Sequence, residues 1–220
     1  MSRRLTGAVF QSLDGVIQAP GGPEEDRSGG FENGGWLAGV YDEGFGEALD
    51  QLFAEPFDLL LGRRTYDIFA AYWPYNQDHP IGATFQRINK YVLTQSSEPL
   101  EWDNSQRLES VDALARLKQG DGADLIIQGS STLYPQLLEA GLIDRLVLMI
   151  FPLTLGTGKR LFGDGTPPRS MRMVDHVVTA LGTIIATYEP AGAVETGSFA
   201  TKPPSEAEID RRGRVVEGNW

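Results

Sequence analysis

The hydrophobic positions of the chain fall into short, nearly continuous runs that are separated by amphipathic stretches. Turn-forming residues bound each run, a pattern that is typical of strands buried on both faces of a sheet. The predicted strands are Leu5–Phe10, Phe57–Leu61, Lys90–Leu93, Asp124–Ile127 and Arg145–Pro152.

Between these runs, apolar residues recur at helical spacing. The stretch Asp42–Phe53 places Phe45, Leu49 and Leu52 on one face of a helix. Two further helices are predicted, Val111–Leu117 after the N-cap residue Ser110 and Thr132–Ala140 before Gly141. Strands that alternate with helices indicate an α/β domain whose mostly parallel sheet is covered on both faces.

The C-terminal part changes character. Residues 183–200 contain two strand-like stretches separated by Pro-Ala-Gly, which predicts an antiparallel hairpin that completes a mixed sheet. Ser205 and Glu208 have the spacing of a capping box, so a helix is predicted after them. We therefore expect one domain over residues 1–200 and a helical extension over 201–220. The glycine-rich segment 18–36 is long for a loop, and such loops are usually functional or disordered.

Composition narrows the class of protein. The 220 residues can bury one substantial core, and the net charge of −11 argues against a nucleic-acid partner. The absence of cysteine excludes disulfides and thiolate metal sites, and the two histidines lack ligand spacing, so no metal is expected. The longest apolar run, 146–153, is too short to cross a bilayer, and the N-terminus lacks the apolar core of a signal peptide. We expect a cytoplasmic enzyme or binding protein without a membrane partner.

The sequence "GRRT" at 62–65 ends a predicted buried strand with two positive charges and a hydroxyl. In a parallel α/β sheet, ligands gather at the carboxyl ends of the strands, where helix N-termini present free N–H groups. Gly62 lets the backbone approach a ligand, an arginine can bind a phosphate, and Thr65 can cap the helix or bind an anion. A solvated arginine pair followed by an ordinary helix cap is the alternative explanation.

Two other strand ends also carry small hydroxyl residues. Thr94 and Ser96 follow one strand, and Gly129, Ser130, Ser131 and Thr132 follow another. Hydroxyls are also common in plain turns, but three such strand ends together favour an extended ligand with phosphate groups, such as a dinucleotide. No acidic residue directly follows Lys90–Leu93 to bind a ribose 2′-hydroxyl, which favours NADPH over NADH. Neither a GxGxxG fingerprint nor a P-loop is present.

Four motifs, in this order along the chain, resemble those of the dihydrofolate-reductase-like superfamily: "SLDGVI" (12–17), "LLLGRRTY" (59–66), "QGSSTLYPQLLEAGLIDRLVL" (128–148) and "PLTLGTGKRLF" (152–162). The most similar branch is named for the C-terminal reductase domain of the bifunctional riboflavin-biosynthesis deaminase/reductase. The resemblance spans roughly residues 3–190. It implies a three-layer α/β/α fold around a mixed sheet, NADPH as the cofactor, and a homodimer.

The resemblance also implies roles for individual residues. Arg63 would contact the 2′-phosphate, Arg64 and Thr65 the pyrophosphate, and the backbone of Phe10 and Ile17 the nicotinamide carboxamide. Segment 18–36 would close over the reacting rings. The full implied cofactor set is Phe10, Ile17, Gly62, Arg63, Arg64, Thr65, Thr94, Ser96, Gly129, Ser130, Ser131, Thr132 and Leu133.

The chain departs from the riboflavin reductases at two positions of their substrate site. Ala8 stands where that family has a lysine, and Gln128 where it has a glutamate. The companion zinc deaminase domain is absent from the chain. The cofactor part of the resemblance is therefore better supported than the riboflavin-precursor part. Gln128 and Trp36 are the candidate substrate-binding residues.

A reductase also needs a proton donor or a polarising group. Asp14 near the nicotinamide loop, and Asp42 and Glu43 at the start of the first helix, are candidates by location. An Asp-Gly turn explains Asp14 equally well, and a helix N-terminus explains the other two. The sequence thus predicts an NADPH-dependent reductase of a small, pterin- or aminopyrimidine-like heterocycle, resembling 5-amino-6-(5-phosphoribosylamino)uracil reductase. The alternative is a non-catalytic NADPH-binding sensor or scaffold.

Overall fold

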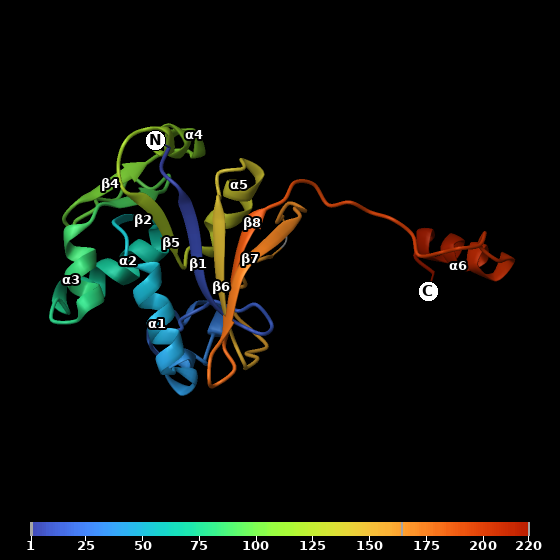
Figure 1. Cartoon of the computed structure of the whole chain (residues 1–220), viewed down its shortest axis with the longest axis horizontal. Helices are drawn as coiled ribbons and strands as arrows, with labels where there is room; N and C mark the ends of the chain where they lie inside the picture. Colours follow the sequence, from blue (N-terminus) through green and yellow to red (C-terminus); the bar gives the residue numbers. More distant parts are fainter. Residues whose placement is uncertain (1, 164, 220) are drawn as a thin grey trace.

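A single eight-stranded sheet organises the computed structural model, which describes residues 2–163 and 165–219 (Figure 1). The strand order is β4-β3-β2-β5-β1-β6-β8-β7, and strands β1 to β6 are mutually parallel. β8 is antiparallel to β6, and β7 is antiparallel to β8. The strands are β1 Leu5–Ser12, β2 Phe57–Gly62, β3 Lys90–Leu93, β4 Ser105–Leu108, β5 Asp124–Gln128, β6 Arg145–Phe151, β7 Met171–Val178 and β8 Ile184–Pro190.

Helices cover both faces of this sheet. On one face, α4 and α5 contribute Leu114 and Leu137 to a core that includes Leu5 and Leu125 of the strands. On the other face lie α1, α2 and α3, together with the 3-10 helices η2 and η3. The helices are α1 Glu43–Leu52, α2 Arg63–Tyr72, α3 Pro80–Arg87, α4 Val111–Gln119, α5 Tyr134–Glu139, α6 Glu206–Val216, η1 Ser28–Gly30, η2 Trp36–Val40, η3 Trp73–Tyr75 and η4 Ser131–Leu133. The predicted three-layer α/β/α architecture with a mostly parallel mixed sheet is confirmed.

Side-chain caps set where several helices begin. Asp42 accepts a hydrogen bond from the N–H of Phe45 at the start of α1, and Ser110 accepts one from Ala113 at the start of α4. Ser205 does the same for α6. These caps satisfy backbone donors that the helix itself leaves unpaired. The helix starts predicted from the cap residues Ser110 and Ser205 are confirmed.

The predicted hairpin over 183–200 is wrong in one of its two strands. The antiparallel partner of β8 is β7, which precedes it, and residues 191–200 form no strand. The sequence missed β7 because Arg172, Asp175 and His176 interrupt its apolar residues. Such a pattern suits an exposed edge strand rather than a buried run. The short, polar edge strand β4 was missed for the same reason.

After β8 the chain leaves the sheet. An extended segment leads to α6, which lies apart from the α/β body in Figure 1. Among the described residues, α6 included, the structure contains no helix with the length and apolar character needed to span a bilayer.

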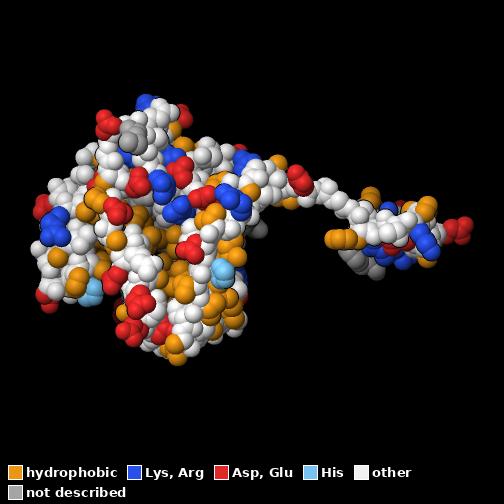
Figure 2. Space-filling model, in the orientation of Figure 1, with side chains coloured by type: hydrophobic (Ala, Val, Ile, Leu, Met, Phe, Trp, Pro, Cys, Tyr) orange, Lys and Arg blue, Asp and Glu red, His pale blue; other side chains and the backbone are white. Residues whose placement is uncertain are grey.

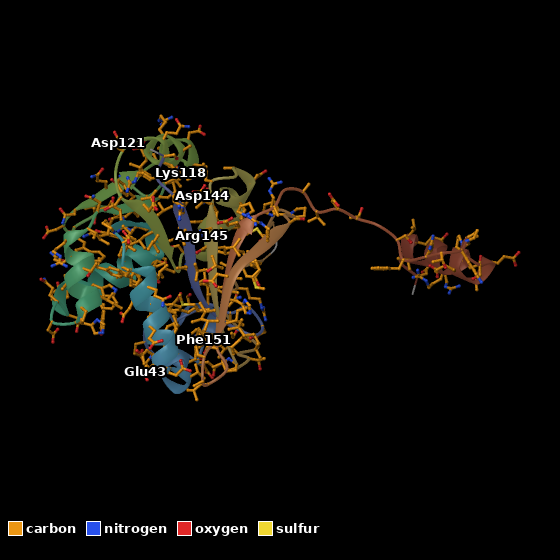
Figure 3. The ribbon with its side chains drawn as sticks, viewed as in Figure 1. Glu43, Lys118, Asp121, Asp144, Arg145 and Phe151 are labelled. Carbon is orange, nitrogen blue, oxygen red and sulfur yellow. The ribbon has the colours of Figure 1, made fainter. Side chains whose placement is uncertain are left out.

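Lys90, the first residue of β3, is a fully buried cation. Its Nζ donates a hydrogen bond to the carbonyl of Phe85 at 2.8 Å and lies 4.4 Å from the ring centroid of Trp102. No carboxylate among the described residues forms an ion pair with it. Burial in this low-dielectric setting lowers the pKa of Lys90 to about 8. By contrast, the ion pair of Lys118 with Asp144 lies at the partly exposed amino end of the parallel strands (Figure 3).

The depressed pKa of Lys90 predicts a pH-dependent stability. Between about pH 8 and the ordinary value of 10.5, the unfolded chain binds more protons at this residue than the folded chain. The free energy of unfolding should therefore rise as the pH increases from 8 to 10. Urea titrations at several pH values test this. Lys90→Met should flatten the rise, whereas Lys202→Met, at an exposed lysine, should leave it intact; equal slopes in the two variants would contradict the assignment.

Candidate functional site

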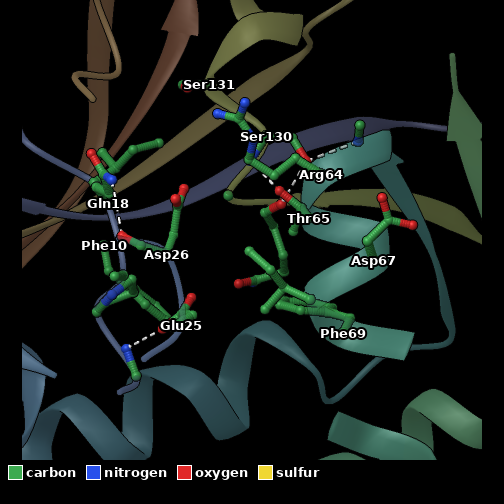
Figure 4. Close-up of a pocket in the computed structure, with 18 of the residues that line it drawn as sticks. Phe10, Gln18, Glu25, Asp26, Arg64, Thr65, Asp67, Phe69, Ser130 and Ser131 are labelled. Atoms are coloured by element: carbon green, nitrogen blue, oxygen red, sulfur yellow. Dashed lines mark hydrogen bonds between the residues drawn. The ribbon is translucent and has the colours of Figure 1, made fainter. Parts of the chain in front are cut away.

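A cavity of about 1450 Å³ lies at the carboxyl ends of the parallel strands. β1 and β5 are neighbours in the sheet, but β1 leads through α1 toward β2 while β5 leads through α5 to β6 on the other side. Because α1 and α5 cover opposite faces of the sheet, a crevice remains at the carboxyl ends of β1 and β5. Open α/β sheets bind their ligands in such a crevice. The walls of the cavity come from β1, the 17–26 loop, α1, α2 and the end of β5 (Figure 4).

The "GRRT" segment forms the junction between β2 and α2. The helix begins at Arg63 with Gly62 as its N-cap, and no side chain of the described residues caps it. The residues of its first turn, Arg63 to Thr65, line the cavity. Free N–H groups at a helix N-terminus give that end of the helix a partial positive charge. An uncapped helix N-terminus of this kind is a ready anion-binding site.

The end of β5 is hydrogen-bonded to that junction. The Ser130 hydroxyl accepts a hydrogen bond from the Gly62 N–H at 2.9 Å, and Thr65 Oγ1 accepts one from the Ser130 N–H at 3.1 Å. Gly129 and Ser130 are both left-handed, each with φ of 56°. A serine in this conformation is strained, and such strain is held where the surrounding contacts require it. Thr65 therefore joins two strand ends rather than capping α2.

The two arginines of the segment have different surroundings. Arg63 Nε donates to both carboxylate oxygens of Asp67, at 2.8 and 3.0 Å, and Arg63 Nη1 donates to the Glu98 carbonyl. Arg64 also lines the cavity, but it is exposed and forms no ion pair with the described part of the chain. Arg64 therefore supplies an uncompensated positive charge at this wall, whereas the charge of Arg63 is shared with Asp67.

At the end of β3, side-chain hydroxyls shape the turn. Thr94 Oγ1 accepts a hydrogen bond from the Ser96 N–H, and Ser96 Oγ accepts one from the Glu98 N–H. Thr94 lines the cavity, whereas Ser96 does not. The other residues of the implied cofactor set also line it: Phe10, Ile17, Gly62, Arg63, Arg64, Thr65, Gly129, Ser130, Ser131, Thr132 and Leu133.

The inner part of the cavity is formed by the open edge of β1. Pairing of β1 with β5 ends at Ala8 and Gln128, while pairing with β6 continues to Ser12. Beyond the last pair with β5, Val9 and Phe10 of β1 line the cavity. The Ile17 N–H donates to the Lys159 carbonyl at 2.8 Å, which leaves only the Ile17 carbonyl for a ligand. Nearby, the buried Nε2 of Gln128 has no hydrogen-bond partner in the resolved chain. Unpaired buried donors are costly, so this amide is suited to a ligand.

Segment 18–36 is held at both ends by buried side chains. Gln18 Nε2 donates to the carbonyls of Asp26 and Ser28, and Gln18 Oε1 accepts from the Lys159 N–H. Trp36 is buried against Phe151, and its Nε1 donates to the Gln18 carbonyl at 2.9 Å. Trp36, predicted from sequence to bind substrate, therefore anchors the loop and does not line the cavity. Residues 20–26 of the loop do line it.

The three acids proposed as proton donors lie outside the cavity lining. The Asp14 carboxylate accepts hydrogen bonds from Ser12 Oγ, the Leu155 N–H and the Gly156 N–H, and these contacts lower its pKa to about 2. Asp42 caps α1 and also accepts from the Leu181 N–H at 2.8 Å. Glu43 is the first residue of α1, at the end of the helix near Phe151 (Figure 3).

Among the acids that line the cavity, Glu25 and Asp26 of the loop were not singled out in the sequence. Asp26 forms an ion pair with Lys159. Although burial alone would raise the pKa of Asp26, the contacts with Lys159 and Ser28 lower it on balance. In a glycine-rich loop, the run Glu24, Glu25, Asp26 looks like a solvated surface, so only its position in the fold reveals these two carboxylates.

Comparison with known proteins agrees with this architecture. Residues 3–185 match the family described as the RibD C-terminal domain. YyaP of Bacillus subtilis (strain 168), an uncharacterized protein, is 26% identical over 194 residues, which cover 84% of this chain and 94% of that protein.

Two solved structures have a similar fold. A protein assigned to riboflavin biosynthesis from Shewanella sp. PV-4 is 22% identical with a TM-score of 0.60, covering 87% of this chain and 99% of that one. Dihydrofolate reductase from Enterococcus faecalis, complexed with NADP(H) and RAB-propyl, is 17% identical with a TM-score of 0.55, covering 86% and 99%. With the sheet order and the family match together, the chain belongs to the RibD C-terminal domain family and has the dihydrofolate-reductase-like fold.

Proposed function

We propose that the chain is an NADPH-dependent reductase of a small heterocyclic compound. The observation that carries this proposal is the convergence of the ends of β2, β3 and β5 on one wall of a single cavity. There, the uncapped N-terminus of α2, the free charge of Arg64 and the left-handed turn at Gly129 and Ser130 lie together. This wall is suited to the phosphates of a dinucleotide. When bound, NADPH would supply the hydride.

The remaining space supports a second ligand beside the cofactor. Typical small-molecule pockets measure roughly 300–1,000 Å³, and this cavity of about 1450 Å³ is larger. The open edge of β1 at Phe10, the Ile17 carbonyl and the unpaired Gln128 amide lie in the lining where a nicotinamide and its reaction partner would meet. Membership of a family named for a reductase domain, and a neighbour of the same fold that binds NADP(H), support the same conclusion.

A non-catalytic NADPH-binding sensor remains the second candidate, because Asp14, Asp42 and Glu43 do not line the cavity. The absorbance of NADPH, followed during incubation with pterins, aminopyrimidines and quinonoid carbonyls, separates the two. Substrate-dependent oxidation supports the reductase. Tight NADPH binding without turnover across these compounds favours the sensor.

The two arginines predict different effects on nucleotide affinity. If Arg63 contacts the 2′-phosphate, Arg63→Ala removes a charge-assisted contact worth roughly 1.5–3 kcal/mol. The NADPH affinity should fall about 10- to 150-fold, while NADH, which lacks this phosphate, should change little. Arg64→Ala should weaken both nucleotides similarly, because both carry the pyrophosphate. Calorimetric titration of the two variants with both nucleotides measures this.

The melting temperature of each variant serves as the control for folding. Because the 2′-phosphate lies far from the reacting ring, turnover at saturating NADPH should survive in Arg63→Ala. Parallel losses of NADPH and NADH affinity in Arg63→Ala, with a lowered melting temperature, would contradict the contact with the 2′-phosphate. They would show that Arg63 only stabilises the fold through its ion pair with Asp67.

We also propose that the chain forms a homodimer through β7. Within the described residues, this strand pairs only with β8, so its outer backbone groups are free to pair. Large apolar side chains gather over the hairpin (Figure 2). Those exposed on β7, its turn and β8 are Met173, Val174, Val177, Val178, Leu181 and Ile184. In a two-fold symmetric dimer, the same surface patch of each subunit contacts that of the other.

This interface predicts that one charge disrupts the dimer. Val178→Lys, on a side chain that is 58% exposed, should convert a dimer to a monomer without changing NADPH affinity, because the residue does not line the cavity. Ile209→Lys on α6 is the matched control and should leave the dimer intact. Sedimentation equilibrium measures the mass. A wild-type monomer, or an unchanged dimer in Val178→Lys, would refute this interface.

A further inference from the structure

The cavity has an apolar half that lies away from its phosphate-binding wall. Helix α1 contributes Phe45 and Leu49, the residue that follows it contributes Phe53, and α2 contributes Ile68 and Phe69. Flat, aromatic and aliphatic walls of this kind favour a planar ligand with few polar groups. If the phosphate-binding wall holds the dinucleotide, as proposed above, this half is left for the substrate.

The basic groups of the cavity lining are already engaged or lie at the other wall. Lys159 pairs with Asp26, and Arg63 pairs with Asp67. His79 Nδ1 accepts a hydrogen bond from the Ile81 N–H at the start of α3. Arg64 lies beside Ser130, across the cavity from Glu25 (Figure 4). Among the described residues, the apolar half therefore offers no free cation to a phosphate or carboxylate on the substrate.

Glu25 is the acid that faces this half without a cationic partner. Its neighbour Glu24 pairs with Arg27, and Asp26 pairs with Lys159, but no ion pair of the described chain involves Glu25. Its Oε2 accepts a hydrogen bond from the Gly21 N–H at 2.7 Å, which fixes the carboxyl group at the cavity wall (Figure 4). The Glu25 carboxyl group is therefore placed to accept a hydrogen bond from a ligand.

We propose that Glu25 binds the substrate directly, and that the substrate is a flat, largely apolar compound that offers Glu25 a cationic or N–H-donating nitrogen and carries no phosphate. The apolar walls of α1 and α2 would hold the ring system, and the Glu25 carboxylate would select for the nitrogen. This inference deepens the proposed reductase function. It differs from a phosphoribosyl substrate, for which the apolar half offers no free cation.

The electrostatics of Glu25 agree with this geometry. Burial, followed by the nearby charge of Asp26, raises the pKa of the Glu25 carboxyl, although the hydrogen bonds from the loop backbone oppose the shift. A desolvated carboxylate without a counter-ion is costly. A ligand cation would remove that cost on binding, so the preference for a positive ligand should be strong.

Three ligands with one ring system test the inference: 2-naphthamidine, 2-naphthamide and 2-naphthyl phosphate, titrated by calorimetry with and without saturating NADP⁺. The wild-type protein should bind the amidine about tenfold or more tightly than the neutral amide, as expected for a charge-assisted hydrogen bond. With NADP⁺ bound, the phosphate should bind most weakly. Glu25→Gln should abolish the preference for the amidine. Glu24→Gln, at an exposed side chain paired with Arg27, should retain it.

Equal affinities of the wild-type protein for the amidine and the amide would overturn the proposal, as would an unchanged preference in Glu25→Gln. Naphthyl phosphate binding as tightly as the amidine in the NADP⁺-loaded protein would also overturn it. The ranking of ligands by the wild-type protein decides even if Glu25→Gln fails to fold. An absence of NADP⁺ binding would contradict the proposed function instead. In that case, the ratio of the amidine and amide affinities measured without nucleotide still tests the role proposed for Glu25.

Discussion

The hydrogen bonds that join the end of β2 to the end of β5 hold the site together. The Ser130 hydroxyl accepts from the Gly62 N–H, and the Thr65 hydroxyl accepts from the Ser130 N–H, so each strand end orients the other. In this arrangement Ser130 is left-handed, and no side chain of the described residues caps the first turn of α2. The anion-binding character of the wall follows, because backbone donors that no side chain satisfies remain at the cavity surface.

Charge is distributed so that an acidic protein can hold an anion. The chain has a net charge of −11, yet at this wall Arg64 lies free and Arg63 is only partly compensated by Asp67. Across the cavity, Glu25 and Asp26 bring the opposite sign. The site therefore has a positive end and an acidic end with apolar walls between them, and two ligands of different chemistry fit such a gradient better than one.

The convergence of these strand ends on one cavity could be predicted from the sequence, because the signals were local. Gly62–Thr65, Thr94 and Gly129–Leu133 stand directly after buried apolar runs, and parallel strands bring their carboxyl ends together wherever they lie in the chain. Other features depended on tertiary contacts that no local pattern reports. The Asp14 carboxylate accepts hydrogen bonds from the backbone of Leu155 and Gly156, and the Asp42 carboxylate accepts one from Leu181. The Trp36 indole N–H donates to the Gln18 carbonyl. Glu25 lines the cavity only because of the way the loop folds.

The measurement that tests the central claim most directly is amide hydrogen exchange with and without NADPH. If the dinucleotide phosphates lie on the wall formed by the ends of β2 and β5, exchange should slow at residues 62–65 and 129–133, with more protection from NADPH than from NADH at equal concentration. Unchanged exchange in both segments, at NADPH concentrations where calorimetry shows saturation, would contradict the account.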